Sequence, residues 1–169
     1  FQPHDGIRDP LWSRGLGDVY KRQANNNMMN SLIEACIKFS VSLNIACPKN
    51  YQPNKALISL INTQKGKIKI FNKKEIAIKN SDVVMTDKII SLNDKVNKKK
   101  KLKSFKNFKV DKKTMNLAKK DAIFLHCLPR GNEVTEEVFL GKQSKVWQQA
   151  LNRVYVQKSI LLYCFGKLR

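Results

Sequence analysis

The chain of 169 residues is long enough for one domain with a substantial core, and 42% of its residues are hydrophobic. Its longest apolar stretches, such as residues 159–165 and 122–125, are too short to span a bilayer, so we expect a cytoplasmic protein without a membrane anchor. Four cysteines without a Cys-x-x-Cys pair, and only two histidines, indicate reduced thiols rather than a zinc site or a disulfide framework.

The net charge of +20 comes from 33 lysines and arginines against 13 acidic residues. Such an excess supplies the salt-dependent part of nucleic-acid binding. Most of these residues are lysines, however, and the reading of base edges relies on the bidentate fork of arginine. We interpret the charge as a compositional bias on solvated faces, which makes a nucleic-acid partner the less favoured interpretation. The alternative is a basic nucleic-acid-binding module between Lys95 and Lys113, whose Phe105 and Phe108 stack on bases or, as is more typical, anchor the segment to the core.

Residues 1–23 differ in composition from the rest of the chain. They hold three of the seven glycines and show neither helical nor strand periodicity. Residues 13–23 resemble an in-frame translation of a DNA-sequencing library adapter, and residues 5–9 resemble the other end of the same adapter. We therefore expect residues 1–23 to be a non-native, disordered segment and residues 24–169 to form the domain.

After residue 27 the hydrophobic pattern alternates between helical and strand periods. Strands separated by helices indicate an α/β domain with a doubly wound, mainly parallel sheet and helices on both faces. In such sheets ligands bind at the carboxyl ends of the strands, so the loops that begin at Asp87 and Cys127 are the places to look for chemistry. The pattern predicts strands over residues 42–47, 67–71, 82–86 and 122–126, and helices over residues 28–39, 54–63, 73–80, 110–119, 136–140 and 144–164.

Polar side chains that can take part in catalysis or ligand binding follow two of these strands. His126, Cys127 and Arg130 bring an imidazole, a thiol and a guanidinium together at the end of one strand. The thiol becomes a proton acceptor or nucleophile if a neighbouring charge lowers its pKa, whereas a buried free cysteine beside a core histidine is the structural alternative. Asp87, at the end of another strand, can hold an ammonium group. Asparagines at the start of the first helix either cap it or bind a carboxylate.

Five blocks of sequence, in order along the chain, are similar to one known family. They are residues 26–32, 46–49, 81–87, 124–129 and 146–153. The most specific of them are the His-Cys-Leu-Pro block and the Asn-Arg pair that ends the last block. Together they resemble the C-terminal, ornithine-binding half of the ornithine carbamoyltransferases.

The resemblance implies the second-domain fold of carbamoyltransferases and a defined reaction. The family transfers the carbamoyl group of carbamoyl phosphate to the side-chain amine of ornithine, which gives citrulline and phosphate, and it needs no metal or organic cofactor. The resemblance also implies a homotrimer for the full-length enzyme.

The resemblance further implies catalytic roles for four residues. Cys127 and Asp87 contact the reacting amine and the amino-acid head of ornithine, and Cys127 accepts the proton that the amine must lose before it attacks. His126 and Arg153 hydrogen-bond the carbamoyl oxygen, where negative charge develops in the transition state.

A further set of residues is implied to bind the substrate. Asn27 and Ser91 hold the α-amino and carboxylate groups, and Leu92 and Leu128 complete the pocket together with Asp87 and Cys127. The bond between Leu128 and the following proline is expected to be cis. Leu92 stands where the family has methionine, and the next residue is asparagine where the family has glycine, which is expected to affect closure of that loop.

The family also has an N-terminal domain with a Ser-Thr-Arg-Thr-Arg motif for carbamoyl phosphate, and this motif does not occur in the sequence. Without that motif the leaving phosphate has no electrostatic clamp. We therefore expect the chain to be an enzyme fragment that is inactive on its own.

Overall fold

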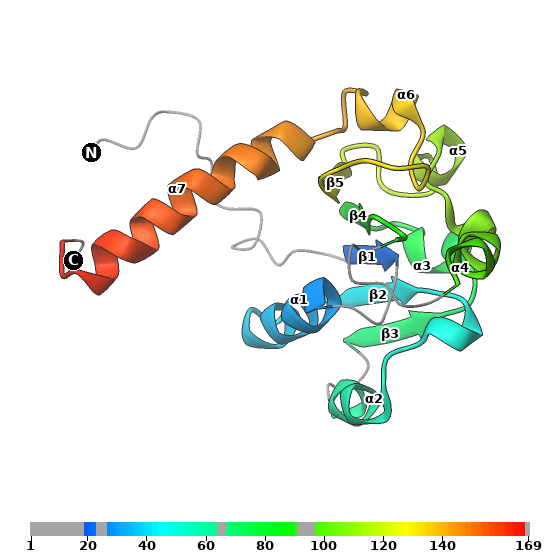
Figure 1. Cartoon of the computed structure of the whole chain (residues 1–169), viewed down its shortest axis with the longest axis horizontal. Coiled ribbons are helices and arrows are strands. Elements are labelled where there is room, and N and C mark those ends of the chain that lie inside the picture. Colours follow the sequence, from blue (N-terminus) through cyan, green and yellow to red (C-terminus); the bar gives the residue numbers. More distant parts are fainter. Residues whose placement is uncertain (1–18, 23–26, 64–66, 91–96, 168–169) are drawn as a thin grey trace.

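The computed structural model describes residues 19–22, 27–63, 67–90 and 97–167. Its strands pair in parallel to form one sheet in the order β3-β2-β1-β4-β5 (Figure 1). The predicted α/β class with a mainly parallel sheet is therefore confirmed. The strands are β1 (Val19–Arg22), β2 (Leu43–Ala46), β3 (Ile68–Phe71), β4 (Val83–Asp87) and β5 (Ile123–Cys127).

The helices lie close to the predicted positions, with two differences. Residues 98–105 form a helix that hydrophobic periodicity did not predict, and the helix predicted over residues 110–119 is confined to 112–115. The helices are α1 (Asn27–Lys38), α2 (Lys55–Asn62), α3 (Lys74–Ile78), α4 (Lys98–Phe105), α5 (Lys112–Met115), α6 (Glu136–Phe139) and α7 (Val146–Cys164).

The helix α5 begins two residues later than predicted, because the two residues before it form a β-bridge and a helix cap. Val110 is extended and pairs with Val134, so it belongs to a β-bridge rather than to a helix. Asp111 then caps the helix, since its Oδ1 accepts a hydrogen bond from the backbone N–H of Thr114 at 2.8 Å. Burial alone would raise the pKa of the Asp111 carboxyl, but this bond and a second one from the hydroxyl of Thr114 lower that pKa below its usual value.

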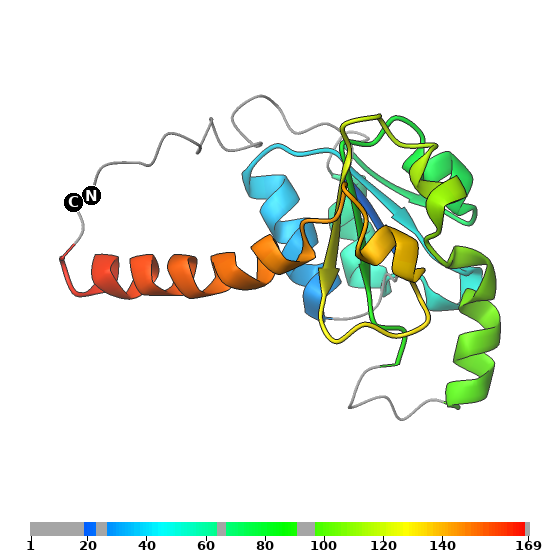
Figure 2. The ribbon, with the colours of Figure 1, turned by 90° about the horizontal axis from the view of Figure 1, so that it is seen from above.

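The two faces of the sheet pack against different helices. Val83 contributes to the core cluster that contains residues of α1 and α2, whereas its neighbour Val84 contributes to the cluster that contains residues of α3, α4, α5 and α6. Phe124 in β5 lies in this second cluster, and Ile123 and Leu125 on either side of it pack against the first. Figure 2 shows α1 on one side of the sheet and α4 to α6 on the other. Helices therefore cover both faces, as predicted.

The strand β1 corrects the expected domain boundary. Its register places Val19 beside Leu43 of β2 on one side and beside Val83 of β4 on the other, so it lies in the middle of the sheet. Residues 19–22 are thus part of the domain, and the expectation of disorder was wrong for them. A strand of four residues can be missed by periodicity because its backbone pairing, not its side-chain pattern, fixes its place.

The helix α7 extends away from the rest of the domain (Figures 1 and 2). Of its residues only Val146 is buried. Although no helix in the described part of the chain is long and apolar enough to cross a membrane, α7 exposes large apolar side chains along its whole length. Nine of them, each 44–73% exposed, are Trp147, Leu151, Val154, Tyr155, Val156, Ile160, Leu161, Leu162 and Tyr163.

Replacing Lys21 by proline is expected to break the sheet at its centre. Proline removes a backbone N–H and is not tolerated in a central strand, where the unpaired carbonyl of the neighbouring strand costs about 1–3 kcal/mol. Lys21→Ala removes the same side chain and keeps the N–H, so it serves as the matched control. Urea denaturation should show a much lower midpoint for Lys21→Pro than for Lys21→Ala, and equal midpoints would contradict the placement of β1.

Candidate active site at the carboxyl edge of the sheet

The strand order creates a crevice at one edge of the sheet. From β1 the chain passes through α1 to β2 and β3 on one side, and after α3 it returns to β4 on the other side of β1. The carboxyl ends of β1 and β4 therefore border the point where the strand order reverses, which is where doubly wound sheets bind ligands. Asp87 ends β4, and its Cα partner across the ladder is Cys127, the last residue of β5. The two predicted functional residues thus lie side by side.

A cleft of about 560 Å³ opens beside this edge. It joins the end of β5, the first turn of α1 and the first half of α7. Four predicted site residues line it, and Asp87 lies next to it through its pairing with Cys127. The lining residues are Met28, His126, Cys127, Leu128, Gln149, Ala150 and Arg153.

Gln149 connects α7 to the end of β5. Its side-chain Oε1 accepts a hydrogen bond from the backbone N–H of His126 at 3.0 Å. This bond fixes α7 where Arg153, one turn further along the helix, lines the same cleft as Cys127. The Leu128–Pro129 peptide bond is cis, as predicted.

His126 is buried and paired with an acidic residue. Its Nε2 lies 3.0 Å from Oε1 of Glu133, and the two residues are only 1% and 2% exposed. Oε1 also accepts a hydrogen bond from the backbone N–H of Gly131. Nδ1 of His126 is buried and has no hydrogen-bond partner among the described residues. The ring therefore has one nitrogen committed to Glu133 and one available to a ligand.

The ionised form of Glu133 is stabilised where it lies. Burial alone would raise the pKa of its carboxyl, but the hydrogen bonds from His126 and from the backbone N–H of Gly131 outweigh burial and lower that pKa below its ordinary value. Sequence reasoning did not select Glu133. One signal was present in the sequence, since Glu133 is an acidic residue in a lysine-rich chain and stands in the loop that follows the His-Cys-Leu-Pro block.

Aromatic rings support His126 from the other side. The ring of Phe139 meets the imidazole edge to face with a centroid distance of 6.1 Å, and Trp147 meets Phe139 in the same way at 5.9 Å. The guanidinium of Arg130 lies 5.1 Å from the centroid of Phe139. Arg130 is thus used in a cation–π contact and does not line the cleft.

The four cysteines lie in different environments. Burial raises the pKa of Cys36 to about 11 and that of Cys47 to about 12, so both remain protonated thiols of the core. Cys164 is exposed near the end of α7, whereas Cys127 is half-buried at the cleft. Cys127 is therefore the thiol placed to meet a ligand.

Three predicted substrate-binding residues have side chains outside the described part of the chain. Ser91 and Leu92 lie outside the described residues, as does the asparagine that follows them. The backbone of Asn27 begins α1, next to Met28 at the cleft, while its side chain is outside the description. Their roles stay predictions.

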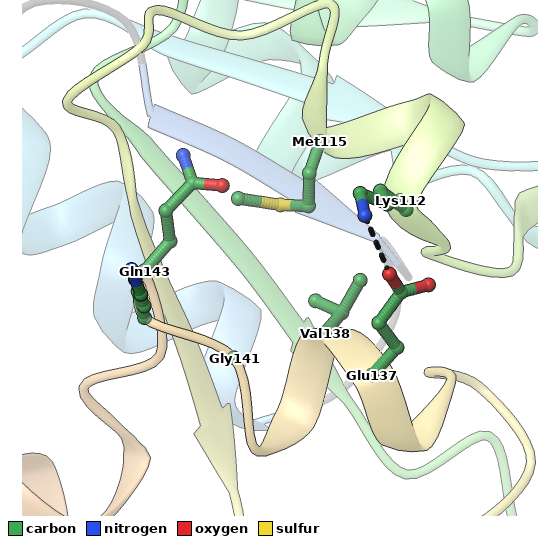
Figure 3. Close-up of a pocket in the computed structure, with 7 residues that line it drawn as sticks. Lys112, Met115, Glu137, Val138, Gly141 and Gln143 are labelled. Atoms are coloured by element: carbon green, nitrogen blue, oxygen red, sulfur yellow. Dashed lines mark ion pairs between the residues drawn. The ribbon is translucent and has the colours of Figure 1, made fainter.

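A smaller pocket lies between α5 and α6 (Figure 3). Its volume is about 260 Å³, and Met115 and Val138 contribute apolar surface to it. Lys112 and Glu137 form an ion pair of 2.8 Å at its rim, with both side chains more than half exposed. An ion pair that exposed contributes little to stability. No predicted site residue lines this pocket, so it is not the candidate active site.

The nucleic-acid alternative depended on aromatic side chains that are exposed within the lysine-rich segment. Phe105 and Phe108 are 0% and 6% exposed and belong to the core cluster, where Phe105 also contacts Tyr51 at a centroid distance of 5.1 Å. These rings are not available to stack on bases. Four lysines of α4 lie outside the core, and Lys101 is buried.

The fold and the cleft together define a doubly wound α/β domain with a cleft at the carboxyl edge of its sheet, lined by a thiol, an imidazole and a guanidinium. Residues 17–164 match the sequence profile of the aspartate/ornithine carbamoyltransferase family, Asp/Orn-binding domain. The chain therefore belongs to this family. The match begins before β1, which agrees with a domain that includes residues 19–22.

Several proteins that are similar to this chain in sequence are named ornithine carbamoyltransferases. The one from Methanococcus maripaludis is 44% identical over 148 residues, which is 83% of this chain and 49% of that protein. The one from Helicobacter hepaticus is 44% identical over 164 residues, which is 94% of this chain and 48% of that protein. The chain thus spans about half the length of these relatives.

Solved structures agree with the sequence comparison. The anabolic ornithine carbamoyltransferase of Campylobacter jejuni superimposes with a TM-score of 0.80 at 36% identity, covering 88% of this chain and 51% of that one. The ornithine carbamoyltransferase of Pyrococcus furiosus gives a TM-score of 0.80 at 31% identity, covering 94% and 54%.

Replacing Glu133 by glutamine is expected to remove an acid-sensitive part of the stability. Because folding lowers the pKa of Glu133, its contribution is fully present above the carboxyl's ordinary pKa and is lost as pH falls through the lowered one. Breaking a buried pair of this kind costs about 3 kcal/mol near neutral pH.

Urea denaturation between pH 7 and the acid range measures this effect. The difference in free energy of unfolding between the parent chain and Glu133→Gln should become smaller as pH falls. Glu137→Gln is the matched control, because Glu137 is in an exposed ion pair. A gap that stays constant with pH, or an equal loss in Glu137→Gln, would contradict the role of Glu133.

Proposed function

We propose that this chain is the ornithine-binding half of a carbamoyltransferase, which transfers the carbamoyl group of carbamoyl phosphate to ornithine and releases citrulline and phosphate. The observation that carries the proposal is the cleft that brings the thiol of Cys127 and the guanidinium of Arg153 together beside Asp87. The names of the similar proteins support ornithine as the acceptor.

The proposed reaction begins with the side-chain amine of ornithine. It is protonated near neutral pH, so it must lose a proton before its nitrogen attacks the carbamoyl carbon. The thiolate form of Cys127 accepts that proton and becomes a thiol, and Asp87, at the end of the neighbouring strand, holds the cationic amine until then. The new bond joins the amine nitrogen to the carbamoyl carbon, the bond from that carbon to the phosphate oxygen breaks, and the nitrogen gives its second proton to the leaving phosphate.

Negative charge that develops on the carbamoyl oxygen needs hydrogen-bond donors. Arg153 is the donor on α7, and His126 is the second when its Nδ1 carries a proton. Glu133 holds Nε2 through the 3.0 Å contact and so leaves Nδ1 as the ring nitrogen for this role. Asn27, Ser91, Leu92 and Leu128 complete the proposed ornithine site.

The partners of the whole enzyme are part of the same proposal. We propose that the other half of the protein binds carbamoyl phosphate, that the full-length enzyme is a homotrimer and that it works in the cytoplasm. The length of the relatives supports the first of these proposals, since the chain matches about half of each. The exposed apolar side chains of α7 support the presence of a further packing partner, because a helix with so much apolar surface is typical of one that packs against another element.

Calorimetry with a bisubstrate analogue of ornithine tests the proposed binding site. Cys127→Ala and Asp87→Ala should each abolish the heat, because both contact the amine. Cys164→Ala changes an exposed thiol outside the cleft and should leave the heat unchanged. Binding that survives both cleft substitutions would show that the analogue binds elsewhere.

Turnover tests whether the chain needs a second half. The chain alone should form no citrulline, and a hybrid in which the N-terminal half of the Methanococcus maripaludis relative precedes it should form citrulline. Loss of a proton acceptor typically costs at least about 100-fold in rate, so Cys127→Ala should lower kcat of the hybrid by about that factor. Family-like turnover by the chain alone would contradict the proposal.

A further inference from the structure

Gly131 lies in the turn after β5, two residues before Glu133. Its backbone N–H donates to the same carboxylate oxygen that contacts Nε2 of His126. The carboxylate is therefore held between the main chain of its own turn and the imidazole. Because Glu133 is only 2% exposed, it has no solvent-facing space into which it can swing.

The space beside Gly131 is filled by that carboxylate. A Cβ at position 131 would lie 2.7 Å from Oε2, 3.3 Å from Oε1 and 3.4 Å from Cδ of Glu133. A carbon–oxygen approach of 2.7 Å is well inside the usual van der Waals separation, so one of the two groups has to move. The three atoms that the Cβ would meet all lie at the end of a flexible side chain rather than in the main chain, so the carboxylate is the group that gives way.

The backbone conformation of Gly131 gives no separate reason for a glycine. Among the described glycines only Gly166 has a positive φ, so alanine can adopt the main-chain angles of residue 131. The requirement at this position is therefore steric, and the three nearest atoms that a Cβ would meet all belong to Glu133.

We infer that Gly131 is a positioning residue, whose missing side chain lets the Glu133 carboxylate reach Nε2 of His126 and so determines which ring nitrogen holds the proton. An ionised carboxylate is only an acceptor, so Nε2 must carry the hydrogen. Nδ1 then stays the variable nitrogen, available as an acceptor in the neutral ring or as a donor in the charged ring. Only the use of Nδ1 in carbamoyl transfer rests on the proposed function.

Imidazole ¹⁵N NMR of the full chain tests the inference without any activity. The sequence has only two histidines, His4 and His126, so the signals are readily assigned. The parent chain should show His126 with its proton on Nε2 and slow exchange of that proton. In Gly131→Ala the displaced carboxylate should release it, so that exchange is faster by about tenfold, as for one lost hydrogen bond, and both tautomers are populated. An unchanged Nε2 signal would overturn the inference.

Gly141→Ala is the matched control for a general loss of packing. A Cβ at residue 141 would meet the backbone oxygen of Glu137 at 2.6 Å, so this variant should also lower Tm, yet it should leave the Nε2 proton of His126 protected. If Gly141→Ala exposes that proton equally, loosening of the domain explains the effect and the inference fails.

A double-mutant cycle keeps the inference testable even if Gly131→Ala folds poorly. In a Glu133→Ala background the carboxylate is gone, so adding Gly131→Ala should change Tm little, whereas the same substitution should lower Tm by several degrees when Glu133 is present. Equal shifts in both backgrounds would place the cost in the backbone and overturn the inference. Activity is not measured, so failure of the proposed reaction leaves this outcome unaffected.

Discussion

The structure depends on the two-sided pairing of β1. This strand is hydrogen-bonded to β2 on one edge and to β4 on the other, and within the described sheet it is the link between the β2–β3 pair and the β4–β5 pair. Apolar side chains from both pairs meet in the core cluster beneath α1, which includes residues of β2, β3 and β4. The crevice at the carboxyl edge exists because the chain leaves β1 in one direction and later returns to its other side.

The cleft combines elements that are far apart in the sequence. The start of α1 and the end of β5 follow from sheet topology, whereas α7 reaches the cleft through the bond from the His126 N–H to Gln149. One polar contact in a largely apolar surrounding therefore places Arg153. The hydrogen bond between His126 and Glu133 is also strengthened by burial, because water does not compete for either partner there.

Several parts of this architecture could be predicted from the sequence. The apolar runs that became β4 and β5 ended within one residue of the predicted ends, and those ends placed Asp87 beside Cys127. The strand β1 was missed because it is short and half of it is charged, although central strands are usually apolar throughout. Its segment also resembles an adapter sequence.

Other features depended on tertiary contacts that a local pattern does not contain. The helix α4 consists mainly of lysine, a good helix former without hydrophobic periodicity, and Asn97 caps it through a bond to the N–H of Lys100. Glu133 has no regular spacing to any motif, and it matters only because its turn folds back onto His126. Functional residues at the ends of strands and helices can be identified from the sequence more readily than residues that a turn brings back to the site.

The projecting α7 has a consequence for how copies of the chain meet in solution. A net charge of +20 keeps copies apart at low ionic strength, and the distance over which that repulsion acts shrinks from about 10 Å at 0.1 M salt to about 3 Å at 1 M. Exposed apolar side chains on α7 then approach one another more easily. Added salt should thus act in opposite directions on the two associations that such a chain invites, weakening the capture of polyanions and favouring contact between its own helices.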